Sequence, residues 1–223
     1  MRIFLDTADI DMISKYNAIL PLHGVTTNPS ILARMHQPLE QLIPKLLSVL
    51  QPEQWLFVQV LAKDLLGMLQ DARRINALRA HSIGVKIPVT PVGYQALQAC
   101  ADRGITTLAT AVFSVEQGLI AAKTGARYLA PYVNRLDMAG GDGVGMVSEL
   151  HAALKRYGFN TGIIAASFKT VNQVHELILA GVGAVTVPPD VLEAMLGHPL
   201  TDAAVEQFDR EWLDAFGELR FPL

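Results

Sequence analysis

The chain of 223 residues is long enough for one large domain with a substantial core. A hydrophobic content of 51% and a mean hydropathy of +0.30 are typical of a layered α/β fold with buried parallel strands. The net charge of −3 comes without a basic patch or arginine-rich arm, which argues against nucleic-acid binding. The single cysteine, Cys100, excludes a disulfide within the chain and fits a reducing cytoplasm.

The first residues argue against export. Asp6, Asp9 and Asp11 lie where the apolar region of a secretory signal would lie, so we expect no signal peptide. No apolar run approaches about 18 residues, so we expect no membrane span. These features together predict a cytoplasmic protein that acts on a small molecule, without a nucleic-acid or membrane partner.

Short runs of strand-forming residues recur along the chain, and a helical pattern follows each of them. In chain order the predicted strands are residues 2–5, 24–26, 56–61, 84–87, 106–110, 128–132, 162–166 and 184–187. Alternating strands and helices predict a parallel sheet with crossover helices. Eight such units favour a closed (β/α)8 barrel, the TIM barrel, over an open sheet. Because no linker or break in composition interrupts the pattern, we predict a single barrel domain over residues 1–200.

Several residues predict where helices begin and end. Pro91 is suited to open a helix, and Ser114 lies three residues before Gln117, as a capping residue does. Asp190 is predicted to cap a helix before Glu193. Four glycines fall where helices should stop: Gly104, Gly125, Gly158 and Gly181.

Residues 201–223 follow the complete barrel and predict an extra C-terminal helix, to Phe216, with a short tail. One face of this helix is apolar: Val205, Phe208, Trp212 and Phe216. The helix either packs on its own barrel or reaches a neighbouring subunit. We expect the second arrangement, because large aromatic side chains outside a complete barrel need cover.

Lys86 lies in an apolar strand between Val85 and Ile87. Loss of water disfavours the charged ammonium, so the pKa of Lys86 should fall below the ordinary value of about 10.4. A free amine in a closed site can attack a carbonyl and form a Schiff base. The alternative is a lysine whose head reaches solvent.

Polar residues end nearly every predicted strand, and the carboxyl ends of the strands carry the chemistry in this class of barrel. The candidates are Asp6, Thr26, Asn28, Gln59, Lys86, Thr110, Tyr132, Asn134, Arg135, Ser167 and Lys169. Gln59 and Tyr132 are the clearest, because they lie inside apolar runs. The alternatives are a satisfied core amide for Gln59 and a rim aromatic with its hydroxyl in water for Tyr132.

Arg135, Ser167 and Lys169 follow the sixth and seventh strands, close to where barrels of this class bind phosphate. An arginine can hold a phosphate with two hydrogen bonds, and a lysine adds a point charge. Solvated surface charge is the alternative. Lys169 is the less favoured candidate for the Schiff base, because water past the strand end would keep it protonated. The six histidines show no metal-binding spacing, so we expect an imine mechanism without a metal or another cofactor.

Five stretches of the chain, taken together, resemble the transaldolase family, most closely its fructose-6-phosphate aldolase branch. They are residues 5–8, 24–30, 85–90, 130–135 and 165–170, and the resemblance covers essentially the whole chain. It implies a (β/α)8 barrel with the Schiff-base lysine at Lys86 and a phosphate site at Arg135, Ser167 and Lys169. Asp6 and Asn28 would orient the hydroxyls of a dihydroxyacetone fragment. The resemblance also implies a large ring of subunits, with a decamer as the family expectation.

Three positions resemble the aldolase branch rather than true transaldolases: Gln59, Tyr132 and Ala130. Phe113 departs from the branch, which often has tyrosine there. We therefore expect a class I aldolase that reversibly cleaves fructose 6-phosphate to dihydroxyacetone and glyceraldehyde 3-phosphate. Tyr132 would move the proton, through a water held by Gln59 and Thr110.

The main alternative is a transaldolase, which transfers the dihydroxyacetone unit between sugar phosphates. An isomerase or epimerase on the same barrel would use carboxylates or metals, and Asp6 is the sole carboxylate among the strand-end candidates. A phosphosugar-binding protein without turnover would not need Lys86, Thr110 and Tyr132 together. A sulfonate could also occupy a phosphate site of similar shape.

Overall fold

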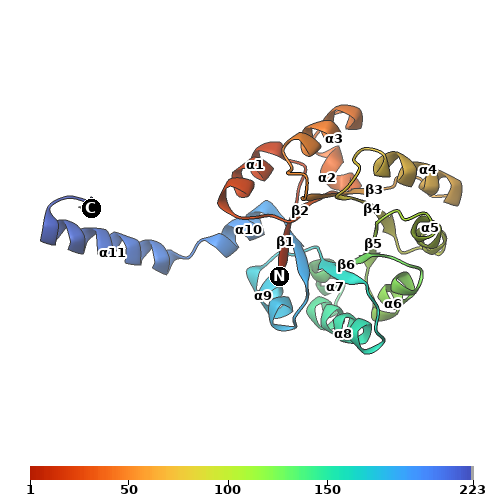
Figure 1. Cartoon of the computed structure of the whole chain (residues 1–223). Helices are drawn as coiled ribbons and strands as arrows, with labels where there is room; N and C mark the ends of the chain where they lie inside the picture. Colours follow the sequence, from red (N-terminus) through yellow and green to blue (C-terminus); the bar gives the residue numbers. More distant parts are fainter. Residues whose placement is uncertain (222–223) are drawn as a thin grey trace.

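Eight parallel strands, β1 to β8, pair in chain order and close into a barrel in the computed structural model, which describes residues 1–221 (Figure 1). The strands are β1 (Arg2–Asp6), β2 (Gly24–Thr26), β3 (Trp55–Gln59), β4 (Ile83–Pro88), β5 (Thr107–Val112), β6 (Tyr128–Pro131), β7 (Gly162–Ala165) and β8 (Ala184–Val187). The prediction of a (β/α)8 barrel with an extra C-terminal helix is confirmed. β2 and β8 have the predicted bounds, and the other strands differ from them by one or two residues at an end.

Helices surround the barrel and cover the outer face of its sheet (Figure 1). They are α1 (Ile10–Ile19), α2 (Pro29–Ala33), α3 (Leu39–Ser48), α4 (Leu65–Asn76), α5 (Pro91–Ala101), α6 (Val115–Lys123), α7 (Val133–Met138), α8 (Gly143–Arg156), α9 (Val171–Leu179), α10 (Pro189–Leu196) and α11 (Pro199–Phe216). Pro91 opens α5 and Ser114 caps α6, as predicted. The four predicted stop glycines have φ between 67° and 91°. Asp190 is not a cap, because Pro189 starts α10 one residue earlier and leaves Asp190 in the first turn.

Side chains along each strand alternate between the helix-covered face and the barrel interior. In β3, Leu56 and Val58 belong to the large core under the helices, whereas Trp55 and Phe57 belong to a smaller cluster inside the barrel. The ring centroid of Phe57 lies 5.5 Å from that of Trp55 and 5.8 Å from that of Tyr128. These aromatic rings fill the lower barrel, so its interior is a packed core and not a channel.

Gly84 on β4 leaves the room that the Phe57 ring occupies. A Cβ atom at Gly84 would lie 2.3 Å from Cε1 of Phe57, so a larger residue there would force the ring to move. Because Gly84 and Lys86 are two residues apart on one strand, they face the same side. Lys86 therefore projects into the barrel in the next layer, toward the carboxyl ends of the strands.

The last helix, α11, leaves the barrel and extends away from it (Figure 1). None of its residues is buried, and Val205, Phe208 and Phe216 are 51%, 64% and 66% exposed. Trp212 lies on Phe216 with ring centroids 4.5 Å apart. Within residues 1–221, no helix combines the length and the apolar character that crossing a membrane requires. The predicted tail ends outside these residues, at positions 222 and 223.

Candidate active site

Lys86 lies inside the barrel near the carboxyl end of β4 and is only 2% exposed. Its Nζ donates a hydrogen bond of 2.7 Å to the backbone carbonyl of Thr27. Burial lowers the pKa of Lys86, the carboxylate of Asp6 opposes this change, and the guanidinium of Arg135 adds to it. A lysine head that reaches solvent is thus ruled out, and the amine has the environment that Schiff-base chemistry requires.

Asp6 ends β1 and accepts a hydrogen bond of 2.6 Å from Oγ1 of Thr26. Oγ1 of Thr26 also lies 2.6 Å from Oγ1 of Thr186 on β8, so the three residues form a connected polar group on the neighbouring strands β8, β1 and β2. Burial raises the pKa of Asp6, whereas Lys86 and the hydrogen bond from Thr26 lower it. Burial therefore pushes Asp6 and Lys86 toward their neutral forms while their mutual attraction favours the charged ones. Such a pair can hold and pass on a proton.

Tyr132, the predicted proton-transfer residue, lies beside Arg135 of the predicted anion site. Its hydroxyl lies 3.1 Å from Oγ1 of Thr110, and the residue is only 7% exposed, so the rim-aromatic alternative is wrong. The guanidinium of Arg135 lies 4.8 Å from the centroid of the Tyr132 ring, which positions the cation by a cation–π contact. Phe113, the departure from the family pattern, packs edge-on against Tyr132 at 5.5 Å and so contacts the site directly.

Two residues other than glycine have a left-handed backbone at this mouth. Ala111 has φ of 58° where the pairing of β5 shifts between Thr110 and Val112. Ser167 has φ of 62°, and its carbonyl accepts a hydrogen bond of 2.7 Å from the backbone of Asn134. Such strained positions persist only where the surrounding structure holds them, and they gather at functional sites.

Gln173 on α9 joins α7, which follows β6, to the loop after β7, and it is not among the residues predicted from the sequence. Its Nε2 donates to the side chains of Asp137 at 2.7 Å and Asn134 at 3.3 Å. Its Oε1 accepts from the backbone of Lys169 at 2.9 Å and of Thr170 at 3.2 Å. The spacing of Thr170 and Gln173 signals the capping box that they form, but it does not reveal the contacts with the neighbouring loop.

Lys169 and Arg135 are both exposed at the surface of the mouth. The side chain of Lys169 is 67% exposed, and its Nζ lies 3.3 Å from the carboxylate of Asp190. This exposed, ion-paired position suits an anion binder and not a buried imine-forming amine. Among residues 1–221, no carboxylate lies within 4.0 Å of the Arg135 guanidinium, so this cation is available to an anion.

Gln59 and Asn28 differ in how many hydrogen bonds their side-chain amides already make. Gln59 pairs with Lys86 across β3 and β4, and its side-chain amide makes no hydrogen bond with any described residue. The satisfied-amide alternative for Gln59 therefore fails, and the amide is free to hold a substrate or a water. The side-chain oxygen of Asn28 caps α2 by accepting from the backbone of Ile31 at 3.0 Å, which leaves its NH2 group for a substrate.

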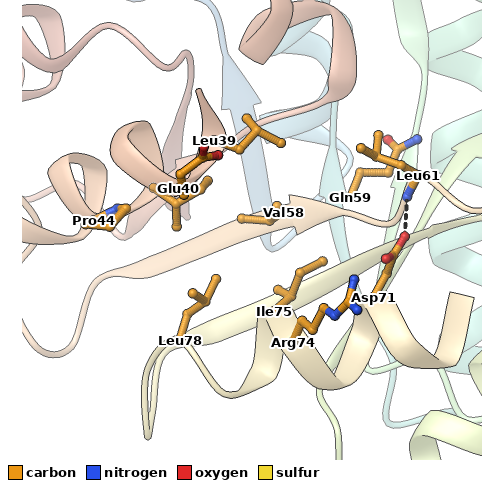
Figure 2. Close-up of a pocket in the computed structure, with 11 residues that line it drawn as sticks. Leu39, Glu40, Pro44, Val58, Gln59, Leu61, Asp71, Arg74, Ile75 and Leu78 are labelled. Atoms are coloured by element: carbon orange, nitrogen blue, oxygen red, sulfur yellow. Dashed lines mark hydrogen bonds between the residues drawn. The ribbon is translucent and has the colours of Figure 1, made fainter. Parts of the chain in front are cut away.

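A cavity of about 580 Å³ lies outside the barrel between α3 and α4, beside β3 (Figure 2). Its walls are mostly apolar, and Lys86 and Tyr132 are not among its lining residues. At its edge, the carboxylate of Asp71 accepts from the backbone of Leu61 at 2.9 Å and of Ala62 at 3.0 Å. Gln59 is the candidate residue among its lining residues, and the buried amine lies elsewhere, whereas Asp71 fixes the segment that follows Gln59.

A closed barrel with a buried amine, a neighbouring acid and two paired hydroxyls at its strand ends is equipped for carbonyl chemistry through the amine. The chain belongs to the Transaldolase/Fructose-6-phosphate aldolase family, whose model matches residues 3–219. It is therefore an enzyme of the transaldolase or aldolase type.

The fold is also similar to solved barrels of other families. One is a mandelate oxidase mutant with the monooxide FMN adduct, at 12% identity and a TM-score of 0.57 over 84% of this chain and 63% of that one. Another is L-talarate dehydratase from Polaromonas sp. JS666 complexed with Mg and L-glucarate, at 15% identity and a TM-score of 0.55 over 84% of this chain and 52% of that one. The chain thus spans less than two thirds of these proteins, and at such identities the likeness shows the fold alone.

Proposed function

We propose that this protein is a class I aldolase that reversibly cleaves fructose 6-phosphate to dihydroxyacetone and glyceraldehyde 3-phosphate. The observation that carries the proposal is the buried amine of Lys86, whose pKa is lowered by burial and which lies near Asp6. Gln59 and Tyr132, the residues of the aldolase branch, favour an aldolase over a transaldolase. The proposed compartment is the cytoplasm, since the chain has no disulfide to maintain.

The first half of the reaction forms an imine. Nζ of Lys86 attacks the C2 ketone, and the carbinolamine loses water to give a protonated imine. The carbonyl of Thr27 accepts a hydrogen bond from one N–H of the amine. This contact directs the lone pair of Nζ away from the carbonyl and toward the substrate. Asp6 can take the proton that the amine releases and return it to the leaving hydroxyl.

The second half breaks the C3–C4 bond. The imine takes up the electron pair as the C4 hydroxyl gives its proton to Asp6, which is ionised again after the first half, and glyceraldehyde 3-phosphate leaves. Arg135, Ser167 and Lys169 hold its phosphate until then. The hydroxyl of Tyr132, oriented by Thr110, donates the proton that quenches the enamine left on Lys86 and regains a proton from Asp6 through water; hydrolysis then releases dihydroxyacetone.

The fate of the enamine separates the proposed aldolase from the alternative, a transaldolase. The test is incubation with fructose 6-phosphate and no acceptor aldehyde, following glyceraldehyde 3-phosphate over time. We expect many turnovers, because Tyr132 can protonate the enamine. A burst of about one equivalent per chain that resumes only with erythrose 4-phosphate would identify a transaldolase. No product and no trapped imine would contradict both activities.

Replacing Gln173 with alanine is expected to weaken substrate binding, because the loops after β6 and β7 lose the side chain that joins them. We expect KM for fructose 6-phosphate to rise about tenfold, with a smaller change in kcat, and stability to fall by about 1–3 kcal/mol. The matched control is Asn172→Ala on the same helix, whose side chain bonds only to exposed Glu176. Equal effects of the two substitutions would contradict the positioning role.

We also propose that a second copy of the chain covers α11, within a large ring-like homo-oligomer for which a decamer is the family expectation. The exposed apolar side chains of Phe208 and Phe216 support this proposal, since they have no cover from their own barrel. Replacing both with serine is expected to lower the native mass measured by light scattering. An unchanged mass would assign the contact between copies to another surface.

A further inference from the structure

Thr186 on β8 is connected to Asp6 by hydrogen bonds inside the barrel. Ala184, two residues earlier on the same strand, belongs to the cluster inside the barrel, so Thr186 faces the same interior. Thr186 is only 1% exposed, and its Oγ1 lies 2.6 Å from Oγ1 of Thr26 on β2, which is fully buried. Oγ1 of Thr26 in turn lies 2.6 Å from the carboxyl group of Asp6 on β1. Thr186 therefore reaches Asp6 through one intermediate hydroxyl group.

The number of protons fixes the direction of these two hydrogen bonds. A hydroxyl group has one proton to donate, and an ionised carboxylate has none. Thr26 donates its proton in the bond to Asp6, so in its contact with Thr186 it can only accept. Among residues 1–221, Thr26 is also the one hydrogen-bond partner of the Thr186 hydroxyl. This hydroxyl chain therefore runs from Thr186 through Thr26 to an ionised Asp6.

The hydroxyl chain stabilises the ionised form of Asp6 more than the neutral form, because a carboxylate is the stronger acceptor. As the donor to Thr26, Thr186 polarises that hydroxyl and strengthens the bond that it makes with Asp6. If a protonated Asp6 donated to Thr26 instead, the chain would reverse. The proton of Thr186 would then have no acceptor among residues 1–221, and an unpaired hydroxyl inside a barrel is unfavourable.

The other groups that act on Asp6 are charged and lie outside the hydroxyl chain. Burial raises the pKa of Asp6, whereas Lys86 on β4, Arg135 on α7 and Arg34 after α2 lower it. Asp190 lines the cavity beside Asp6, but it is paired with a lysine. All these charges remain when a neutral hydroxyl group is removed from β8. A substitution there therefore isolates the effect of the hydroxyl chain.

We propose that Thr186 is a positioning residue of the active site, which holds Thr26 as a donor and so keeps Asp6 ionised. This inference rests on the proposed aldolase function, in which Asp6 accepts the proton of the C4 hydroxyl. A neutral Asp6 cannot accept that proton. Thr186 thus sets the lowest pH at which the C3–C4 bond breaks, although it exchanges no proton with the substrate itself.

Thr186→Val tests the proposal, because valine has the shape of threonine without the hydroxyl group. We expect the pH at which Asp6 titrates to rise by about 0.5–1 unit, which corresponds to the loss of one hydrogen bond. The measurement follows the infrared absorption of the protonated carboxyl group against pH, assigned to Asp6 by its loss in Asp6→Asn. Thr186→Ser keeps the hydroxyl group and should restore the wild-type titration.

Thr107→Val is the matched control. Thr107 on β5 is also 1% exposed, but its Oγ1 has no hydrogen-bond partner among residues 1–221. This variant makes the same chemical change in another buried strand and should leave the titration of Asp6 where it is. Where Thr186→Val does not fold, Thr186→Ala removes the same hydroxyl without adding a methyl group.

The pH dependence of kcat for fructose 6-phosphate connects this titration with the reaction. The value of kcat depends on groups in the enzyme–substrate complex, where Lys86 is already bonded to the substrate, so its acid limb should follow Asp6. The rate rises as Asp6 loses its proton, and a higher pKa of Asp6 moves that rise to higher pH. We therefore expect the acid limb of Thr186→Val to move up with the infrared titration, with a smaller change in the plateau.

The outcomes separate this inference from the function on which it rests. An Asp6 titration that Thr186→Val does not change would overturn the role of Thr186 and leave the aldolase intact. An equal shift in Thr107→Val, or no recovery in Thr186→Ser, would do the same. A shifted titration in a protein that neither cleaves fructose 6-phosphate nor forms a trapped imine would keep the hydroxyl chain and overturn the aldolase. Thermal unfolding across the same pH range checks that each variant is folded.

Discussion

Lys86→Met is expected to abolish the covalent adduct that forms when the protein is reduced with borohydride in the presence of fructose 6-phosphate. The wild-type chain should gain one reduced sugar fragment, and the variant none, because methionine fills the space but has no amine. Turnover should fall at least about a thousandfold, as it does when a nucleophile is removed. Mass spectrometry of the intact chain and of its peptides measures both the adduct and its position.

The matched control is Lys169→Met, which removes the other lysine at the mouth. This variant should bind the substrate phosphate more weakly and still form the adduct, since the side chain of Lys169 is exposed and charged. An adduct that persists in Lys86→Met and maps to Lys169 would overturn the assignment of the reacting amine.

The pH dependence of imine trapping by borohydride is an independent measure of the environment of Lys86. Burial lowers the pKa of Lys86 from 10.5, so imine formation should reach its plateau below that pH. The carboxylate of Asp6 favours the charged ammonium and opposes this shift. Asp6→Asn removes that carboxylate, so the pKa of Lys86 should fall further and the profile should move to lower pH. A shift to higher pH would contradict the attraction between the two groups.

The sequence was sufficient to predict the barrel and the buried amine, because both leave a local signal. Alternation of strand and helix patterns identifies the fold, and a single charge inside an apolar run identifies Lys86. The face of each strand also follows from the two-residue period, which places Gln59 and Lys86 inside the barrel.

What the sequence could not predict are contacts between segments that lie far apart in the chain. The hydroxyl pair of Thr110 and Tyr132 and the contacts of Gln173 with Asn134 and Asp137 depend on how segments that follow different strands meet. The left-handed backbone at Ala111 has no local signal either, because alanine has no preference for it. Periodicity defines the face on which a residue lies but not the residue that it meets there.

Tyr132→Phe is expected to change the fate of the enamine more than any other step. The ring remains, so the contacts that it makes with Arg135 and Phe113 should persist and the anion site should stay intact. Only the hydroxyl is lost. This hydroxyl protonates the enamine when the enamine does not attack an acceptor aldehyde. Removing a general acid slows the step that it serves by about 10²–10⁴-fold. The ratio of transfer to hydrolytic release should therefore rise at least tenfold, since transfer does not require this proton.

The measurement follows dihydroxyacetone and sedoheptulose 7-phosphate from fructose 6-phosphate with erythrose 4-phosphate as acceptor. Tyr128→Phe is the matched control, because it removes a hydroxyl from another buried tyrosine, which lies on β6 and packs in the aromatic core against Phe57. Thr110→Val removes the partner hydroxyl and should also raise the ratio, but by a smaller factor. The Tyr132 hydroxyl remains in this variant but loses the 3.1 Å contact that orients it. An unchanged ratio in Tyr132→Phe would assign the proton transfer to another group at the mouth, such as Asp6, whose charge acts on Lys86. A ratio that rises equally in Tyr128→Phe would instead show that the barrel core, and not the hydroxyl, controls the partition.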